Sequence, residues 1–164
     1  MNGWLRSARN RLESAGFVIL DDLSFDGRKI AFLARRSRFE WTKFGMSETF
    51  FTFAEFEHLT TQRLRNFSAV AYQCAIRHKT VPLPCGFFEC VWSYAVAVAE
   101  DVDPDALTSV QRDTPPMHWA SAEIPAVYDL GQRDLFYFEQ TPLWGSAYWA
   151  GFRREIDELL GTID

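Results

Sequence analysis

Cysteines and histidines are the side chains of this sequence with the widest chemical range, as metal ligands or as a nucleophile with its base. Four residues separate Cys85 from Cys90, which is the upper limit for a pair of zinc ligands on one turn. His78 and His118 are the nearest imidazoles along the chain. A structural zinc site usually needs a second closely spaced pair, and the sequence has none. We therefore expect no metal site and no cofactor.

A catalytic thiol needs a neighbouring base and surroundings that stabilise the thiolate. Cys90 begins an expected strand that is buried on both faces, and Cys85 does not lie at the start of an expected helix. Cys74 falls on the apolar stripe of a helix, where cysteine behaves as a small hydrophobic residue. We expect the three thiols to be reduced and structural, and we assign no catalytic residue among them.

A basic stretch with interleaved aromatic residues is a second candidate, because such a surface can neutralise phosphates and stack bases. The chain as a whole is acidic, with a sequence pI of about 5.2, and alternation along a strand would divide the basic residues between two faces. Nucleic-acid binding is therefore disfavoured. Its candidate residues are Arg28, Arg35, Arg36, Arg38 and Trp41.

Aromatic residues make up 16% of the chain, which is more than a core of this size needs. Many gather in the last third, where Gly145 and Gly151 interrupt an expected helix. Glycine inside a helix costs roughly 1 kcal/mol relative to alanine, so we expect a closely packed neighbour there. Tryptophan and tyrosine favour interfaces and pockets. Packing in the core alone also explains such a cluster, and a small-ligand pocket is a further alternative to a protein interface. The candidate interaction residues are Trp119, Tyr137, Trp144, Tyr148 and Trp149.

Charge is divided unevenly along the chain. Residues 1–80 hold 13 Lys+Arg and 8 Asp+Glu, whereas residues 81–164 hold 4 and 14, within a net charge of −5. The acidic half is also rich in aromatic and β-branched residues, so it is not a solvated tail. Two halves of opposite charge are expected to fold on each other or on a second copy.

Length and composition predict one domain over residues 1–164. With 48% hydrophobic and 24% charged residues, the chain has the composition of an ordinary globular domain. It contains no apolar stretch of the roughly 18 residues that span a bilayer and no secretory signal pattern near the first residue. We expect a cytoplasmic protein without a membrane partner.

Periodicity then predicts the elements. The apolar spacing of 3–15 and of 61–78 is helical, with Thr60 or Thr61 as the second helix's N-cap. Asp103-Pro104 begins a third helix that ends near Arg112, and Thr141-Pro142 begins a fourth that lasts to Leu160. Strands are expected over 17–22, 29–36, 38–44, 48–53, 90–98, 117–130 and 135–139, with an Asp26-Gly27 turn between the first two.

Two strands carry specific expectations. In 90–98, large residues alternate with small ones and neither face is charged, which predicts a central strand with a helix packed closely on its small face. In 117–130, Pro125 predicts an edge position or a bulge.

The order helix, three strands, helix, strand over residues 3–98 resembles the core of the PD-(D/E)xK nuclease superfamily. The resemblance implies that Asp26, before the second strand, and Glu40 with Lys43, on the third, hold a divalent ion and activate water. Glu40 and Lys43 are three residues apart where the family motif has two. On a regular strand they would therefore point to opposite faces, unless a bulge intervenes.

Together these patterns predict an α+β domain, with an antiparallel or mixed sheet of five to seven strands and about three main helices. The function we expect is a non-catalytic protein-interaction or self-associating module. The alternative is a divalent-metal-dependent phosphodiesterase or nuclease of the PD-(D/E)xK type, built on Asp26, Glu40 and Lys43.

Overall fold

The computed structural model describes residues 2–25, 27–40, 45–80, 89–142, 146–161 and 163. Within these residues the chain forms four helices and nine strands. In chain order they are α1 (Gly3–Ser14), β1 (Val18–Leu20), β2 (Ser24–Phe25), β3 (Arg28–Lys29), β4 (Phe32–Glu40), β5 (Gly45–Leu59), α2 (Thr61–His78), β6 (Glu89–Val102), α3 (Pro104–Arg112), β7 (Met117–His118), β8 (Ser121–Asp129), β9 (Asp134–Tyr137) and α4 (Ser146–Leu160). The expected α+β class is confirmed.

Seven of the described strands form one mixed sheet in the order β1-β4-β5-β6-β8-β7, with β9 also paired to β8. The strands β5, β6 and β8 are parallel to one another, and the remaining pairs are antiparallel. Parallel neighbours need a crossover connection, and α2 supplies it between β5 and β6. The small β2–β3 hairpin stands apart from the sheet.

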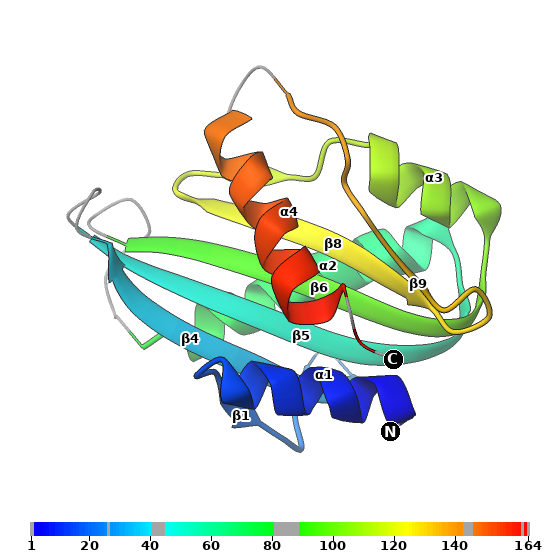
Figure 1. Cartoon of the computed structure of the whole chain (residues 1–164), viewed down its shortest axis with the longest axis horizontal. Helices are drawn as coiled ribbons and strands as arrows, with labels where there is room; N and C mark the ends of the chain where they lie inside the picture. The colour runs from blue at the N-terminus through cyan, green and yellow to red at the C-terminus, as the bar shows by residue number, and fades with distance from the viewer. Residues whose placement is uncertain are drawn as a thin grey trace.

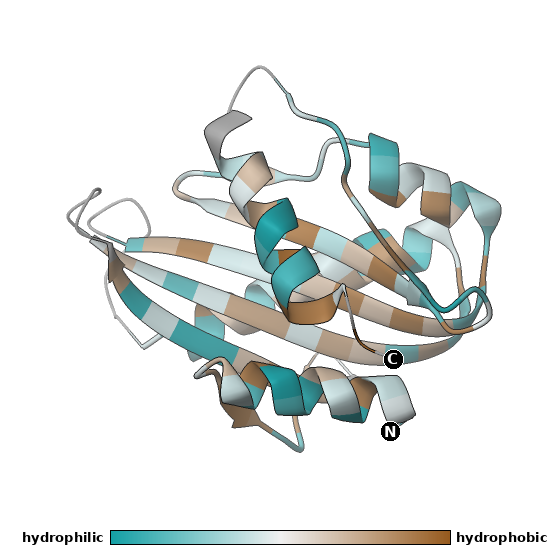
Figure 2. Ribbon diagram, viewed as in Figure 1, coloured by the Kyte–Doolittle hydropathy of each residue, from teal (hydrophilic) through white to brown (hydrophobic). Residues whose placement is uncertain are grey.

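The helices cover the sheet on both faces. Figure 1 shows α1 and α4 on the face toward the viewer and α2 behind the sheet. One core lies under α1 and α4, and a second lies between the sheet and α2 with α3. In Figure 2, apolar residues run along the central strands, and hydrophilic residues are interspersed along α1 and α4. Both helices therefore present an apolar side to the sheet and a polar side to solvent.

The central strand has the predicted character. In β6 the large residues Trp92 and Tyr94 face α4, and Ala95 and Ala97 face α2. The small side chains let α2 pack closely, with its apolar stripe buried from Leu64 to Ala75. The predicted helix on the small face is confirmed.

The helix starts predicted at Thr60 and Pro104 are confirmed, whereas the start predicted at Thr141-Pro142 is wrong, because α4 begins at Ser146. The Thr60 side chain accepts a hydrogen bond from the backbone N–H of Arg63, and Pro104 opens α3. At α1, the Asn2 side chain accepts from the N–H of Leu5. These contacts satisfy backbone donors that lack a partner within the helix.

The strand predicted over 38–44 is wrong as a separate element. Arg38 to Glu40 continue β4, and Gly45, which lies between the predicted strands 38–44 and 48–53, begins β5 and pairs with Glu40. The third strand of the main sheet is β5, and it extends to Leu59 rather than Phe53. The expected strand over 29–36 is also divided, because Lys29 belongs to β3 and β4 begins at Phe32.

The strand predicted over 117–130 consists of two strands, β7 and β8, joined by a tight turn. Pro125 lies between the part of β8 that pairs with β7 and the part that pairs with β9. The N–H of Glu123 points away from β6 and donates to the carbonyl of Pro116. Residues two apart on a strand have the same orientation, so the nitrogen of Pro125 also points away from β6. The missing N–H of Pro125 therefore costs no hydrogen bond between β8 and β6.

Candidate interaction site

A cleft of about 570 Å³ opens between α4 and the sheet. Its floor comes from β4, β5 and β6, and its walls come from α4 and from the end of α1. We call it the α4 cleft. Its lining residues are Ala15, Arg36, Arg38, Ser47, Thr49, Trp92, Tyr148, Gly151, Phe152, Arg154, Glu155, Glu158 and Leu159.

Strand register builds the floor of the cleft in rows. Arg36 pairs with Thr49, which in turn pairs with Trp92, so the three side chains point to the same face. In the next row Arg38 pairs with Ser47. The same face is filled by aromatic residues further along these strands. In Figure 1, α1 and α4 diverge toward the start of β5. The side chains of these two rows line the α4 cleft.

One ion pair fixes α4 to this floor. Arg36 Nη2 lies 2.7 Å from Glu155 Oε1, and the Tyr94 hydroxyl donates to Glu155 Oε2 at 2.6 Å. The Arg36 guanidinium also stacks over Phe17, with Cζ 4.1 Å from the ring centre, and donates to the carbonyl of Ala15. Arg36 and Glu155 are therefore bound to each other and to the fold.

Burial dominates the electrostatics of this network. It lowers the pKa of Arg36, with a further contribution from the positive charge of Arg38. Burial also raises the pKa of Tyr94 far above its usual value, and the negative charge of Glu155 adds to that shift. The tyrosine therefore stays protonated as a donor. The charged side chains at the exposed rim are Arg38, Arg154 and Glu158.

The wall of the cleft is one side of α4, carrying Tyr148, Gly151, Glu155 and Glu158 at helical spacing. A β-carbon added at Gly151 would have no heavy atom within 4 Å. The close neighbour that the sequence predicts for this glycine is therefore not supplied by the described residues of the chain. Gly151 leaves the wall open instead.

Aromatic rings form the end of the cleft nearest the start of α4. Trp92 lies 5.7 Å from Tyr148 and 5.0 Å from Phe152 between ring centres. Tyr148 is 40% exposed. This part of the cleft is apolar and open to solvent.

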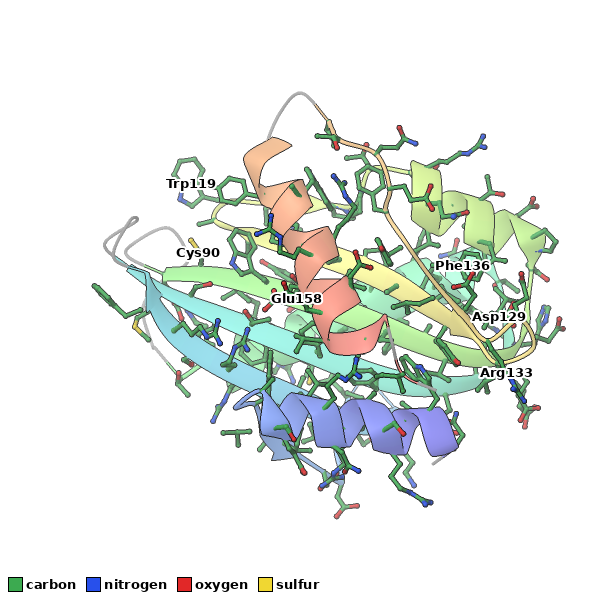
Figure 3. All side chains as sticks on the ribbon, in the orientation of Figure 1. Cys90, Trp119, Asp129, Arg133, Phe136 and Glu158 are labelled. Carbon is green, nitrogen blue, oxygen red and sulfur yellow. The ribbon has the colours of Figure 1, made fainter. Side chains whose placement is uncertain are left out.

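Trp119 stands in the turn between β7 and β8 and is 82% exposed. The next residue, Ala120, has a φ of 54°, and its carbonyl accepts from the N–H of Val91 at 3.1 Å. The turn is thus held beside the start of β6, one residue from Trp92. Figure 3 shows Trp119 and Cys90 at this end of the sheet, with Trp119 projecting away from the ribbon. We call the α4 cleft and Trp119 together the cleft surface.

The basic stretch is divided between faces, as alternation predicts. Arg35 donates to the carbonyl of His78 on the α2 side, whereas Arg36 and Arg38 face α4. Arg28 belongs to the separate β3 strand, and Trp41 lies outside the described residues. The nucleic-acid candidates therefore do not form one surface.

Of the aromatic candidates, Trp119 and Tyr148 are exposed. Trp149 is 1% exposed and packs against Phe138 and Phe152, so it belongs to the core. Tyr137 donates to Asp157. Trp144 lies outside the described residues.

Of the residues implied by the nuclease resemblance, the described part of the chain contains Glu40 alone. Glu40 is the last residue of β4, which is the second strand of the main sheet in chain order rather than the third. Asp26 and Lys43 fall outside the described residues.

Imidazole, carboxylate and hydroxyl groups meet on the opposite face, beside a smaller cavity of about 340 Å³ between α2 and α3. Glu123 accepts from Ser68 at 2.9 Å and lies 3.0 Å from His118 Nε2. His118 stacks on Tyr72. Because Glu123 stands between Ser68 and His118, the imidazole does not contact the hydroxyl, as a serine nucleophile requires. This set is a packing network.

The two described thiols lie on different elements. Cys74 is buried on α2 beside His78, and burial raises the pKa of its thiol. Cys90 is half-buried at the start of β6, and Cys85 lies outside the described residues. Among the described residues, three or more histidine, cysteine or acidic side chains never gather in an arrangement suited to a metal ion.

Sequence reasoning missed Trp92, Arg154 and Glu158 as site residues. The wall of the cleft could have been predicted from the sequence, because helical spacing places four residues on one side of α4: Tyr148, Gly151, Glu155 and Glu158. Trp92 gave no local signal, because its place depends on the parallel pairing of β5 with β6.

No family model, curated protein or solved structure matches the chain. In the part of the chain that the structure describes, each helix is too short or too polar to cross a membrane.

Proposed function

We propose that the chain is a non-catalytic protein-interaction module that binds its partner through the cleft surface. The observation that carries the proposal is the neighbouring position of an exposed tryptophan and an open cleft with aromatic and arginine walls. Residues that dominate binding energy in interfaces are enriched in tryptophan, tyrosine and arginine and sit in well-packed pockets. The cleft surface brings together all three residue types.

The polar groups of the cleft support binding rather than chemistry. Arg36 and Glu155 are engaged with each other and with Tyr94, so they hold α4 in place. Arg38 and Arg154 at the rim present positive charge to a partner, and Glu158 presents negative charge. Rim charges of this kind steer partners and set specificity more than affinity.

Site-specific photocrosslinking tests the proposal. Benzoylphenylalanine replaces Tyr148 in the cleft surface, or Val18 as the matched control. Val18 is 55% exposed on edge strand β1, and its partner Arg35 points to the α2 side. We expect a discrete crosslinked protein at position 148 and none at position 18. The additional substitution Gly151→Leu should abolish the crosslink, because the leucine side chain would project into the cleft and take up the space beside Tyr148.

Equal crosslinking at positions 148 and 18, or a crosslink at position 148 that survives Gly151→Leu, would contradict the proposal. Circular dichroism of the Gly151→Leu protein provides the control for folding. The added side chain meets open space in the folded chain, so its spectrum should match the parent.

A further inference from the structure

We infer that the partner is a second copy of this chain, and that the Trp119 side chain of each copy enters the α4 cleft of the other across a twofold axis. The inference rests on the proposed function and names the partner. It follows from one feature of the cleft surface: a projecting side chain and an open cleft lie next to each other, because the turn that carries Trp119 is bonded to Val91, the neighbour of Trp92.

Trp119 is the projecting part. An aromatic side chain buries roughly 150–250 Å² in a core or interface, and this one is left 82% exposed. The turn that carries it is held by the hydrogen bond from Val91 to Ala120, so the indole is presented from a fixed backbone position. A side chain that is already placed loses less entropy when it binds.

The α4 cleft is the receiving part. Its volume of about 570 Å³ lies within the range of 300–1,000 Å³ typical of ligand pockets. Trp92 and Tyr148 offer ring faces and edges to an indole, and Arg38 and Arg154 at the rim can pack a guanidinium over it. The chemistry of the walls therefore suits an aromatic side chain.

Gly151 is the strongest single indication that something from outside the chain fills the cleft. A helical glycine costs roughly 1 kcal/mol relative to alanine, and the described residues offer no packing reason for this one, since a β-carbon at Gly151 would have none of their heavy atoms within 4 Å. The glycine is explained if an incoming side chain occupies the space beside it.

Symmetry favours a second copy over an unrelated partner. A twofold interface uses the same patch on both molecules, so this patch must contain both the side chain that inserts and the cleft that receives it. The cleft surface contains both, as Trp119 and the α4 cleft. The rim supplies complementary charge as well, because Arg38 and Arg154 on one copy can face Glu158 on the other. Such pairs offset the repulsion between two chains that each carry a net charge of −5.

Sedimentation velocity over a concentration series tests the inference on the intact chain. We expect the parent protein to form a dimer, and both Trp119→Ala and Gly151→Leu to shift it to monomer. A central tryptophan contact contributes at least 2 kcal/mol, so losing both copies of it should weaken the dimer about 1,000-fold. Val18→Ala, which removes an exposed apolar side chain elsewhere, should leave the dimer unchanged.

A mixture of the Trp119→Ala and Gly151→Leu proteins gives the most specific test of the contact between Trp119 and the cleft. The Trp119→Ala copy keeps an open cleft, and the Gly151→Leu copy keeps its tryptophan, so the mixed dimer retains one of the two contacts. It should be about 30-fold weaker than the parent dimer and about 30-fold stronger than either variant alone. An interface that uses Trp119 without the cleft would not show this rescue.

The outcomes separate this inference from the proposed function. The parent chain could prove monomeric while position 148 still crosslinks to a different protein in a way that Gly151→Leu abolishes. That result would overturn the inference that the partner is a second copy, and it would support the proposed interaction module. A parent dimer that survives Trp119→Ala would overturn the tryptophan contact. A monomeric chain without a crosslink would overturn both.

Discussion

The two faces of the sheet are covered in different ways. On the α2 side, Ala95 and Ala97 let α2 lie close, and Ser68 of α2 donates a hydrogen bond to the buried Glu123. On the α4 side, larger residues such as Trp92 meet two helices that diverge, and a cleft with charged and aromatic walls remains.

The difference shows that the alternation of large and small side chains along β6 affects both the stability of the fold and the surface that can bind a partner. The small side chains of β6 permit close packing of α2 and leave little open space beside this strand for a partner. Large side chains on the opposite face build the larger core and also frame the opening. The predictions that follow disturb each face in turn.

The largest effect is expected in the aromatic core of the α4 side. Phe51 is fully buried and stacks on Tyr94, with ring centres 4.2 Å apart. Phe51→Ala should lower the free energy of unfolding by about 3–5 kcal/mol, because it removes buried area and leaves a cavity. Urea denaturation measures the change, and Val18→Ala should stay within about 0.5 kcal/mol.

Enlarging a small residue on the α2 side should cost less. Ala97 is fully buried against α2. Ala97→Leu should destabilise the protein by about 1–3 kcal/mol, because the added carbons have no space. The same denaturation experiment on Gly151→Leu should show no such loss. Equal losses in the two variants would contradict the contrast between the faces.

A smaller change of opposite sign is expected at the cleft wall. Gly151→Ala should raise the free energy of unfolding by about 0.5–1 kcal/mol, since alanine favours the helix and its β-carbon meets no neighbour. Gly161→Ala is the matched control, because its β-carbon would lie 2.8 Å from the carbonyl oxygen of Asp157. A destabilised Gly151→Ala protein would mean that the wall is already packed.

The last effect concerns pH and the contact between β9 and α4. Burial, followed by the hydrogen bond to Asp157, raises the pKa of Tyr137 to about 12. The folded state holds this proton more tightly than the unfolded state, whose tyrosine titrates near pH 10. The stabilisation is therefore complete below about pH 10 and is lost as the pH rises toward 12.

Absorbance of tyrosinate during an alkaline titration measures this shift. Tyr137→Phe should remove a component that titrates near pH 12, and Asp157→Asn should move that component to lower pH. A late component that is unchanged in Tyr137→Phe would assign it to another tyrosine.

Helices and the central strand were predictable because their signals are local. The apolar spacing of α2, the Thr60 cap and the alternation of β6 each act within a few residues. The boundary between β4 and β5 was not predictable, because the alternation of polar and aromatic residues continues along the sequence from Arg38 to Phe44. Only pairing of Glu40 with Gly45 fixes where the chain reverses.

The candidate site was predictable in part for the same reason. Trp119, Tyr148 and Gly151 stand out by residue type alone. The contact of Arg36 with Glu155 joins residues that are 119 positions apart, and it exists because two helices cover the same face. No local pattern encodes that pairing.

Hydroxyl-radical footprinting at low and high protein concentration tests the central claim most directly. It reports the solvent access of single side chains without any substitution. If two copies exchange their indoles, oxidation of Trp119 and Tyr148 should slow as the concentration rises, while Val18 reacts at an unchanged rate. Oxidation of Trp119 at the same rate across the full range, up to sub-millimolar protein, would contradict it.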